Sequence, residues 1–118
     1  MEEKVALISG GTSGIGLACA AELLKCGWRV AINGRSKTQG EKALHILSVL
    51  PSRAVYIQGD VMHDEECCAM VDKTIACFGR MDGLITSAGV YEEQLLEETV
   101  PEDVLRLFTT NVFGTISL

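Results

Sequence analysis

The stretch VALISGGTSGIG, residues 5–16, joins a short apolar run to a turn that holds glycines at positions 10, 14 and 16. The apolar run predicts a strand buried on both faces, and the pattern after Gly14 predicts a helix that Gly27 ends. A glycine-rich turn of this kind lets a phosphate approach the backbone, and a helix N-terminus offers it free N–H groups. We therefore predict a phosphate-containing ligand here; a tight turn without a ligand needs fewer glycines.

The rest of the chain repeats this order of strand and helix. Further strands are predicted at residues 30–32, 54–57 and 84–86. Ser36 and Gln39 form a capping box that opens a helix closed by Pro51, a third helix runs from Asp64 to Gly79, and Pro101 fits the first turn of a fourth. This alternation predicts an α/β fold, a Rossmann-type doubly wound parallel sheet of about four strands, with the helix after the fourth strand unfinished at Leu118.

Apolar spacing also predicts which helix faces are buried. The predicted buried residues are Ile15, Ala18, Cys19, Leu23 and Cys26 in the first helix, Met70, Val71, Ile75 and Phe78 in the third, and Val104, Leu105, Phe108 and Val112 in the fourth. The acidic stretch at residues 92–103 is interpreted as a solvated helix face.

Composition limits the class of protein. The 118 residues, 47% apolar, fit one domain, and a formal net charge of −6 argues against a nucleic-acid partner. No apolar run is long enough to span a membrane and no secretory signal is seen, so we expect a cytoplasmic protein without a membrane partner. The five cysteines lack a CxxC pair or a histidine at ligand spacing, so we expect core or helix-face thiols, no disulfide framework and no metal.

The end of the second predicted strand, Asn33-Gly34-Arg35-Ser36, indicates which nucleotide binds. An acidic side chain there would accept hydrogen bonds from a ribose diol, as in NAD-dependent or adenosylmethionine-binding folds, but none is present. Gly34 leaves space and Arg35 supplies a guanidinium that matches phosphate oxygens, which favours a ribose 2′-phosphate. The alternative is that Arg35 is only a solvated residue at a helix start.

The whole chain resembles the N-terminal half of a short-chain dehydrogenase/reductase. Its residues 9–16 are similar to the TGxxxGIG cofactor loop of that family, with serine for the first threonine, and Gly34-Arg35 resembles the NADP-preferring members. The resemblance implies one NADP-binding Rossmann domain over residues 1–118. The implied cofactor-binding residues are Gly10, Thr12, Ser13, Gly14, Ile15, Gly16, Gly34, Arg35, Ser36, Asp60, Val61, Ser87, Ala88 and Gly89.

Three matches to the family carry particular roles there. Asp60-Val61 falls where an aspartate accepts from the adenine amine, although a strand-end aspartate also caps turns. Thr86-Ser87-Ala88-Gly89 replaces the family's NNAG, which removes the asparagine side chains that brace the centre of the sheet. Asn111 matches the helix asparagine that holds a water for proton relay, which implies a catalytic role; the alternative is a helix polar residue satisfied by backbone or solvent.

The resemblance implies an NADP(H)-dependent oxidoreductase that reduces a ketone or 3-oxoacyl carbonyl, or oxidises the alcohol, and is a homo-oligomer in its complete form. The family's catalytic serine, tyrosine and lysine are missing from this chain, because neither Tyr56 nor Tyr91 has a lysine four residues on. We therefore expect this chain alone to be inactive. Two alternatives stay open: a non-catalytic nucleotide-binding or regulatory protein that pairs with a partner chain, and a methyltransferase, which the missing acid disfavours.

Overall fold

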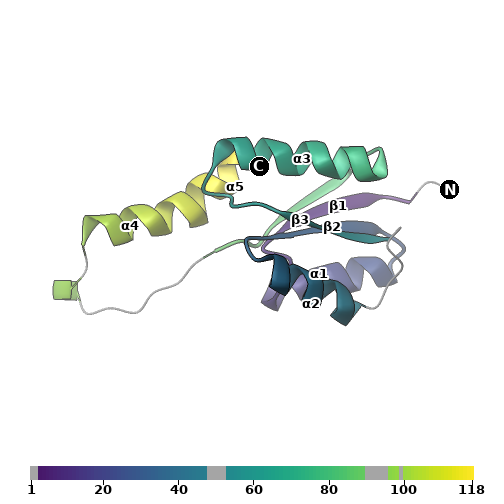
Figure 1. Ribbon diagram of the computed structural model, residues 1–118, viewed down its shortest axis with the longest axis horizontal. Coiled ribbons are helices and arrows are strands. Elements are labelled where there is room, and N and C mark those ends of the chain that lie inside the picture. Colours follow the sequence, from purple (N-terminus) through teal and green to yellow (C-terminus); the bar gives the residue numbers. More distant parts are fainter. Residues whose placement is uncertain (1–2, 48–52, 90–95, 99) are drawn as a thin grey trace.

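The computed structural model describes residues 3–47, 53–89, 96–98 and 100–118 of the chain. The strands β1 (Val5–Ser9), β2 (Arg29–Gly34), β3 (Ala54–Gln58) and β4 (Gly83–Thr86) form one parallel sheet in the order β3-β2-β1-β4 (Figure 1). Because all four strands run in the same direction, their carboxyl ends meet at one edge. The predicted α/β fold with a Rossmann-type parallel sheet is confirmed.

Helices cover both faces of this sheet (Figure 1). The helices α1 (Gly14–Lys25) and α2 (Lys37–Leu47) lie on one face, and α3 (Asp64–Phe78) lies on the other. Leu7 of β1 packs in the α3 layer and its neighbour Ile8 in the α1 and α2 layer, as the strand period of two requires. All five residues of β1 are buried, which explains why this strand reads as one continuous apolar run.

The helix boundaries follow the predicted local signals. Gly27 and Gly79 adopt φ angles of 90° and 79° after α1 and α3, in the left-handed region that favours glycine. At the start of α2, the Gln39 backbone N–H donates to the Ser36 hydroxyl at 3.3 Å. The expected stop at Pro51 lies outside the described residues.

The buried faces of two helices differ from the prediction. In α1, Ile15 is 77% exposed and the buried residues are Gly16 and Ala20, because the helix lies so close to the β1 loop that a Cβ at Gly16 would collide with the Gly10 carbonyl oxygen. In α3, Ile75 is 45% exposed while Thr74 is buried. The Thr74 hydroxyl donates to the Met70 carbonyl at 2.8 Å, so its burial leaves no polar group unsatisfied.

The predicted last helix is interrupted. A 3₁₀ turn η1 (Leu96–Glu98) precedes α4 (Pro101–Phe108), which continues through a π-helical segment η2 (Thr109–Phe113) into α5 (Gly114–Ser117). In Figure 1, α5 lies beside α3, whereas α4 extends away from the sheet. The apolar stripe predicted to be buried is therefore solvated, with exposed fractions from 38% at Val112 to 62% at Leu105.

Other sequence expectations concern charges and thiols. Of the predicted acidic helix face, Glu97, Glu98 and Glu102 are exposed, and part of the stretch lies outside the described residues. Cys67 is a buried residue of α3, where burial raises the pKa of its thiol, and all five cysteines are free thiols. In the described part of the chain, no helix has the length and apolar character needed to cross a membrane.

Candidate nucleotide-binding site

A cavity of about 620 Å³ opens at the carboxyl edge of the sheet. Its walls come from the loops that follow all four strands, and η2 closes one side. This size lies within the range of small-molecule and cofactor sites, and the carboxyl edge of an open parallel sheet is where such folds bind their ligands. All the residues predicted to bind a cofactor line this cavity except Gly16.

The loop after β1 is held tightly against the loop after β4. Gly10 has a φ angle of 63°, and a Cβ on it would lie 2.6 Å from the Ala88 backbone nitrogen. The buried Ser9 hydroxyl accepts hydrogen bonds from the Ser87 and Ala88 N–H groups at 3.2 and 3.4 Å. Ser9 therefore braces the β4 loop.

The N-terminus of α1 faces the cavity and suits an anion. Ser13 is its N-cap residue with extended backbone and no capping side-chain hydrogen bond, and the first turn contains no acidic side chain. Ser13, Gly14 and Ile15 all line the cavity. A Cβ on Gly14 would meet no atom within 4 Å, so close packing does not require this glycine. Its φ angle of 53° does favour glycine, and the missing side chain leaves the turn open to a ligand. The N–H groups of this turn and the helix dipole therefore favour a phosphate.

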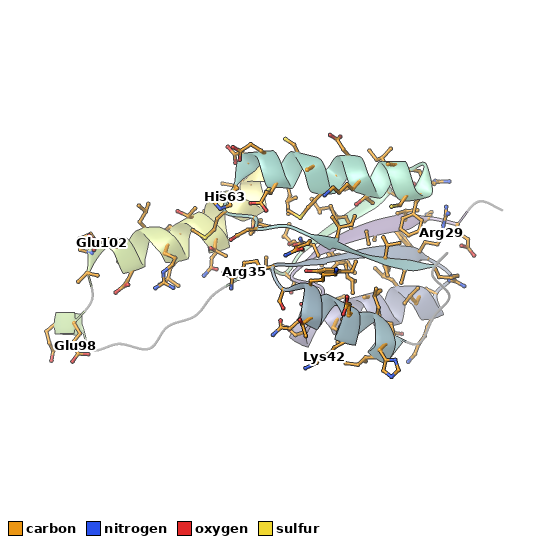
Figure 2. All side chains as sticks on the ribbon, viewed as in Figure 1. Arg29, Arg35, Lys42, His63, Glu98 and Glu102 are labelled. Carbon is orange, nitrogen blue, oxygen red and sulfur yellow. The ribbon has the colours of Figure 1, made fainter. Side chains whose placement is uncertain are left out.

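The end of β2 contributes Gly34, Arg35 and Ser36 to the wall. A Cβ on Gly34 would lie 2.9 Å from the Thr12 side chain, so the glycine lets the β1 and β2 loops touch. The exposed Arg35 lies at this end of the sheet, opposite the end that carries Arg29 (Figure 2). Its guanidinium is thus available to a ligand at the cavity mouth.

The preceding residue, Asn33, lines the same cavity. In the sequence analysis it was considered only because an acidic side chain is absent from this strand end. Its side chain is 1% exposed, and its amide nitrogen donates to the Ile57 and Gly59 carbonyls, both at 3.1 Å. A carboxylate has no hydrogen to donate to these oxygens. Asn33 therefore fixes the end of β3 to the end of β2.

The loop after β3 supplies Asp60 and Val61. The Asp60 carboxylate accepts a hydrogen bond from the Met62 N–H at 2.9 Å, which is the turn-capping arrangement considered as its alternative role. Its backbone N–H donates to the Glu66 carboxylate at 3.2 Å. Asp60 and the buried Val61 nevertheless both line the cavity, so turn formation leaves them placed to meet a ligand.

Two predicted residues lie beside the cavity instead of in its wall. Gly16 packs beneath the β1 loop, and Asn111 lies on η2, where its side-chain oxygen comes within 3.3 Å of a Cβ built on Gly89. Sequence reasoning missed four lining residues: Asn33, Gln39, Gly59 and Thr110. Gln39 was noted only as a capping residue, and the adjacency of Thr110 to Asn111 was the one signal that pointed to it.

Among the described residues, no group of three or more histidine, cysteine, aspartate or glutamate side chains is arranged to hold a metal ion. The residues that line the cavity supply backbone N–H groups, hydroxyls, the side-chain amides of Asn33 and Gln39, and the guanidinium of Arg35 as donors. A parallel sheet with strand order β3-β2-β1-β4 and a glycine loop leading into a helix N-terminus defines a dinucleotide-binding α/β fold.

The comparison with known families agrees with this geometry. The chain belongs to the short-chain dehydrogenase family, whose model matches residues 4–118. It is 33% identical over 117 residues to an uncharacterised oxidoreductase of Methylorubrum extorquens, covering 98% of this chain and 47% of that protein. It is 39% identical over 119 residues to tropinone reductase-like 2 of Erythroxylum coca, covering 97% of this chain and 42% of that one.

The structure of a short-chain dehydrogenase from Bacillus anthracis is similar to this fold, with a TM-score of 0.91 and 30% sequence identity. The match covers 97% of this chain and 47% of the other. The chain therefore spans about half the length of the relatives it matches. Proteins of this family bind NAD(H) or NADP(H).

Proposed function

We propose that residues 1–118 form the NADP-binding Rossmann domain of an NADP(H)-dependent oxidoreductase. In its complete form this enzyme reduces a ketone or 3-oxoacyl carbonyl, or oxidises the alcohol. The observation that carries the proposal is the single cavity in which the α1 N-terminus and Arg35 lie beside the β3 and β4 loops. The likeness to a tropinone reductase-like protein supports a carbonyl substrate.

The residues fit the two phosphate-bearing parts of such a cofactor. Gly10, Ser13 and Gly14 lie at the N-terminus of α1, where the pyrophosphate would meet backbone N–H groups. Gly34 and Arg35 would hold the ribose 2′-phosphate, since no carboxylate lies at this strand end to repel it.

The other predicted residues are assigned to the remainder of the dinucleotide. Thr12, Ile15, Gly16 and Ser36 shape the two loops that hold the phosphates, Asp60 and Val61 would hold the adenine, and Ser87, Ala88 and Gly89 would lie against the ribose of the nicotinamide half. When bound, the cofactor supplies or accepts a hydride. Asn111 would help to hold a water near the reacting carbonyl, and the serine, tyrosine and lysine of the family would come from sequence outside this chain.

Cofactor preference is tested by calorimetric titration of the chain with NADP⁺ and with NAD⁺. We expect NADP⁺ to bind about tenfold more tightly, because an exposed Arg35 would contribute about 1.4 kcal/mol, near the lower end for a charge-assisted hydrogen bond. Arg35→Ala should remove this preference and leave NAD⁺ affinity unchanged. Lys37→Ala is the matched control, because it removes an exposed positive charge two residues away that does not line the cavity.

Two results would contradict the proposal. Tighter binding of NAD⁺ than of NADP⁺ would refute the role of Arg35, and no binding of either would refute the nucleotide site. In the complete form, oxidation of NADPH with a panel of ketones and 3-oxoacyl compounds tests the activity.

We also propose that the complete form is a homo-oligomer. The exposed apolar residues of α4, including Leu105 and Phe108, support this because no other part of the described chain covers them. If sedimentation of the complete form gives the mass of a single polypeptide chain, the proposal of a homo-oligomer is refuted.

A further inference from the structure

Thr110 lines the cavity and carries an unusual hydroxyl group. The residue is 6% exposed, and its hydroxyl oxygen is buried with no hydrogen-bond partner in the structure. The other buried side-chain atoms without a partner in the described part of the chain are the Nε atoms of Arg29 and Arg53. Both arginines donate through another guanidinium nitrogen, so Thr110 differs in having its whole polar group unsatisfied.

Three other threonines on helices satisfy their hydroxyls locally. Thr74, Thr109 and Thr115 each donate to the carbonyl four residues before them, at 2.8, 2.7 and 3.3 Å. Thr110 makes no such bond, although it is adjacent to Thr109 in the same π-helical segment. A buried hydroxyl without a partner destabilises the folded protein, so its position calls for a partner that comes from outside the chain.

The surroundings of Thr110 indicate which part of a dinucleotide it would meet. One turn further on, Gly114 packs so closely on Val61 that a Cβ would lie 2.9 Å from the Val61 carbonyl oxygen. This contact holds the η2 and α5 segments against the β3 loop. Thr110 shares the cavity with Gly59, Asp60 and Val61, and because the Gly114 contact brings its segment against Val61, we place it at the proposed adenine end.

We propose that the Thr110 hydroxyl donates a hydrogen bond to a ring nitrogen of the adenine base. This inference rests on the proposed nucleotide site. The ring nitrogens of adenine only accept hydrogen bonds, so they complement a hydroxyl donor, whereas the Asp60 carboxylate complements the exocyclic amine. The Val61 side chain and the Thr110 methyl group supply apolar contact for the ring.

The test measures binding of adenosine 2′,5′-bisphosphate, which carries the adenine half alone, to the full chain by calorimetry. Thr110→Val keeps the shape of the side chain and removes the hydroxyl, so we expect about five- to tenfold weaker binding. Thr110→Ser keeps the hydroxyl and should bind within about twofold of the parent. Thr109→Val is the matched control: its hydroxyl is bonded to Leu105, it does not line the cavity, and it should leave binding within about twofold.

A second measurement separates this role from a structural one. Without nucleotide, Thr110→Val should raise the thermal midpoint by about 3 °C, because it removes an unsatisfied buried hydroxyl. Unchanged nucleotide affinity in Thr110→Val would overturn the adenine contact while leaving the proposed function intact. A lower midpoint or failure to fold would show that the hydroxyl has a partner within the protein and would also overturn it. No binding by the parent chain would refute the proposed function itself.

Discussion

Replacing Asn33 with aspartate should destabilise the protein by about 4 kcal/mol at neutral pH. The Asn33 side chain is 1% exposed and donates two hydrogen bonds of 3.1 Å, to the Ile57 and Gly59 carbonyls. Losing the donor to a buried carbonyl costs about 1–3 kcal/mol, so two such losses sum to about 4 kcal/mol. The change alters almost no volume, and the effect therefore reports hydrogen bonding and charge.

The destabilisation should depend on pH in a defined direction. A carboxyl group buried beside two carbonyl oxygens has a pKa above that of the same group in the unfolded chain. The ionised form is therefore penalised above the unfolded pKa, and the penalty shrinks as pH falls and the group binds a proton in the folded state. The protonated acid then donates one of the two hydrogen bonds, which should reduce the loss for Asn33→Asp to about 2 kcal/mol at about pH 4.5. Asn33→Ala should cost about 3 kcal/mol at both pH values.

Urea unfolding at the two pH values measures these differences. Gln58→Glu is the matched control, because the Gln58 amide makes one exposed hydrogen bond to the Arg35 carbonyl at 3.1 Å, and it should change stability by less than about 0.5 kcal/mol. A loss below about 1 kcal/mol for Asn33→Asp at neutral pH would refute the bridging role. A loss that grows as pH falls would refute the assignment of Asn33 as the donor.

Two further predictions concern other parts of the fold. Gly10→Ala should lower the free energy of unfolding by about 3–4 kcal/mol, because of the left-handed φ angle and the 2.6 Å approach to Ala88. Gly14→Ala should lower it by only about 1–2 kcal/mol, because a Cβ there meets nothing within 4 Å. Equal effects of the two substitutions in urea unfolding would contradict the packing argument. Asp82 accepts hydrogen bonds from Arg80 at 2.8 and 2.7 Å and from the Val5 N–H at 2.9 Å, which hold its pKa below the usual range. The stabilisation by Asp82 is therefore present above its pKa in the unfolded chain and is lost as pH falls through its pKa in the folded protein. Asp82→Asn should make the free energy of unfolding less dependent on pH between about pH 5 and pH 2. If urea midpoints fall with pH as steeply as in the parent, this prediction is wrong.

Much of the fold could be predicted because its signals are local. The apolar run of β1 and the glycines after α1 and α3 each depend on a few adjacent residues. The helix faces were harder to predict, because the closest contacts in α1 use Gly16 and Ala20 and not its larger apolar residues. Apolar spacing emphasises large side chains, whereas burial here depends on how near the helix lies to the sheet.

The π-helical segment was not predicted for a related reason. The sequence TTNVF contains no proline or glycine that would indicate a change from α-helical to π-helical hydrogen bonding. The role of Gly114, which follows this segment, depends on the distant Val61. Without that contact, neither the position of η2 nor the burial of Thr110 follows from the sequence.

The walls of the cavity are joined by contacts between neighbouring strand ends. Ser9 on β1 binds the β4 loop, Gly34 on β2 admits Thr12 of the β1 loop, and Asn33 on β2 binds the β3 loop. The strand order β3-β2-β1-β4 therefore places short contacts between each adjacent pair of loops. Because each contact joins only two loops, a substitution at Asn33 should disturb the proposed adenine end first, while Ser9 continues to hold the β4 loop.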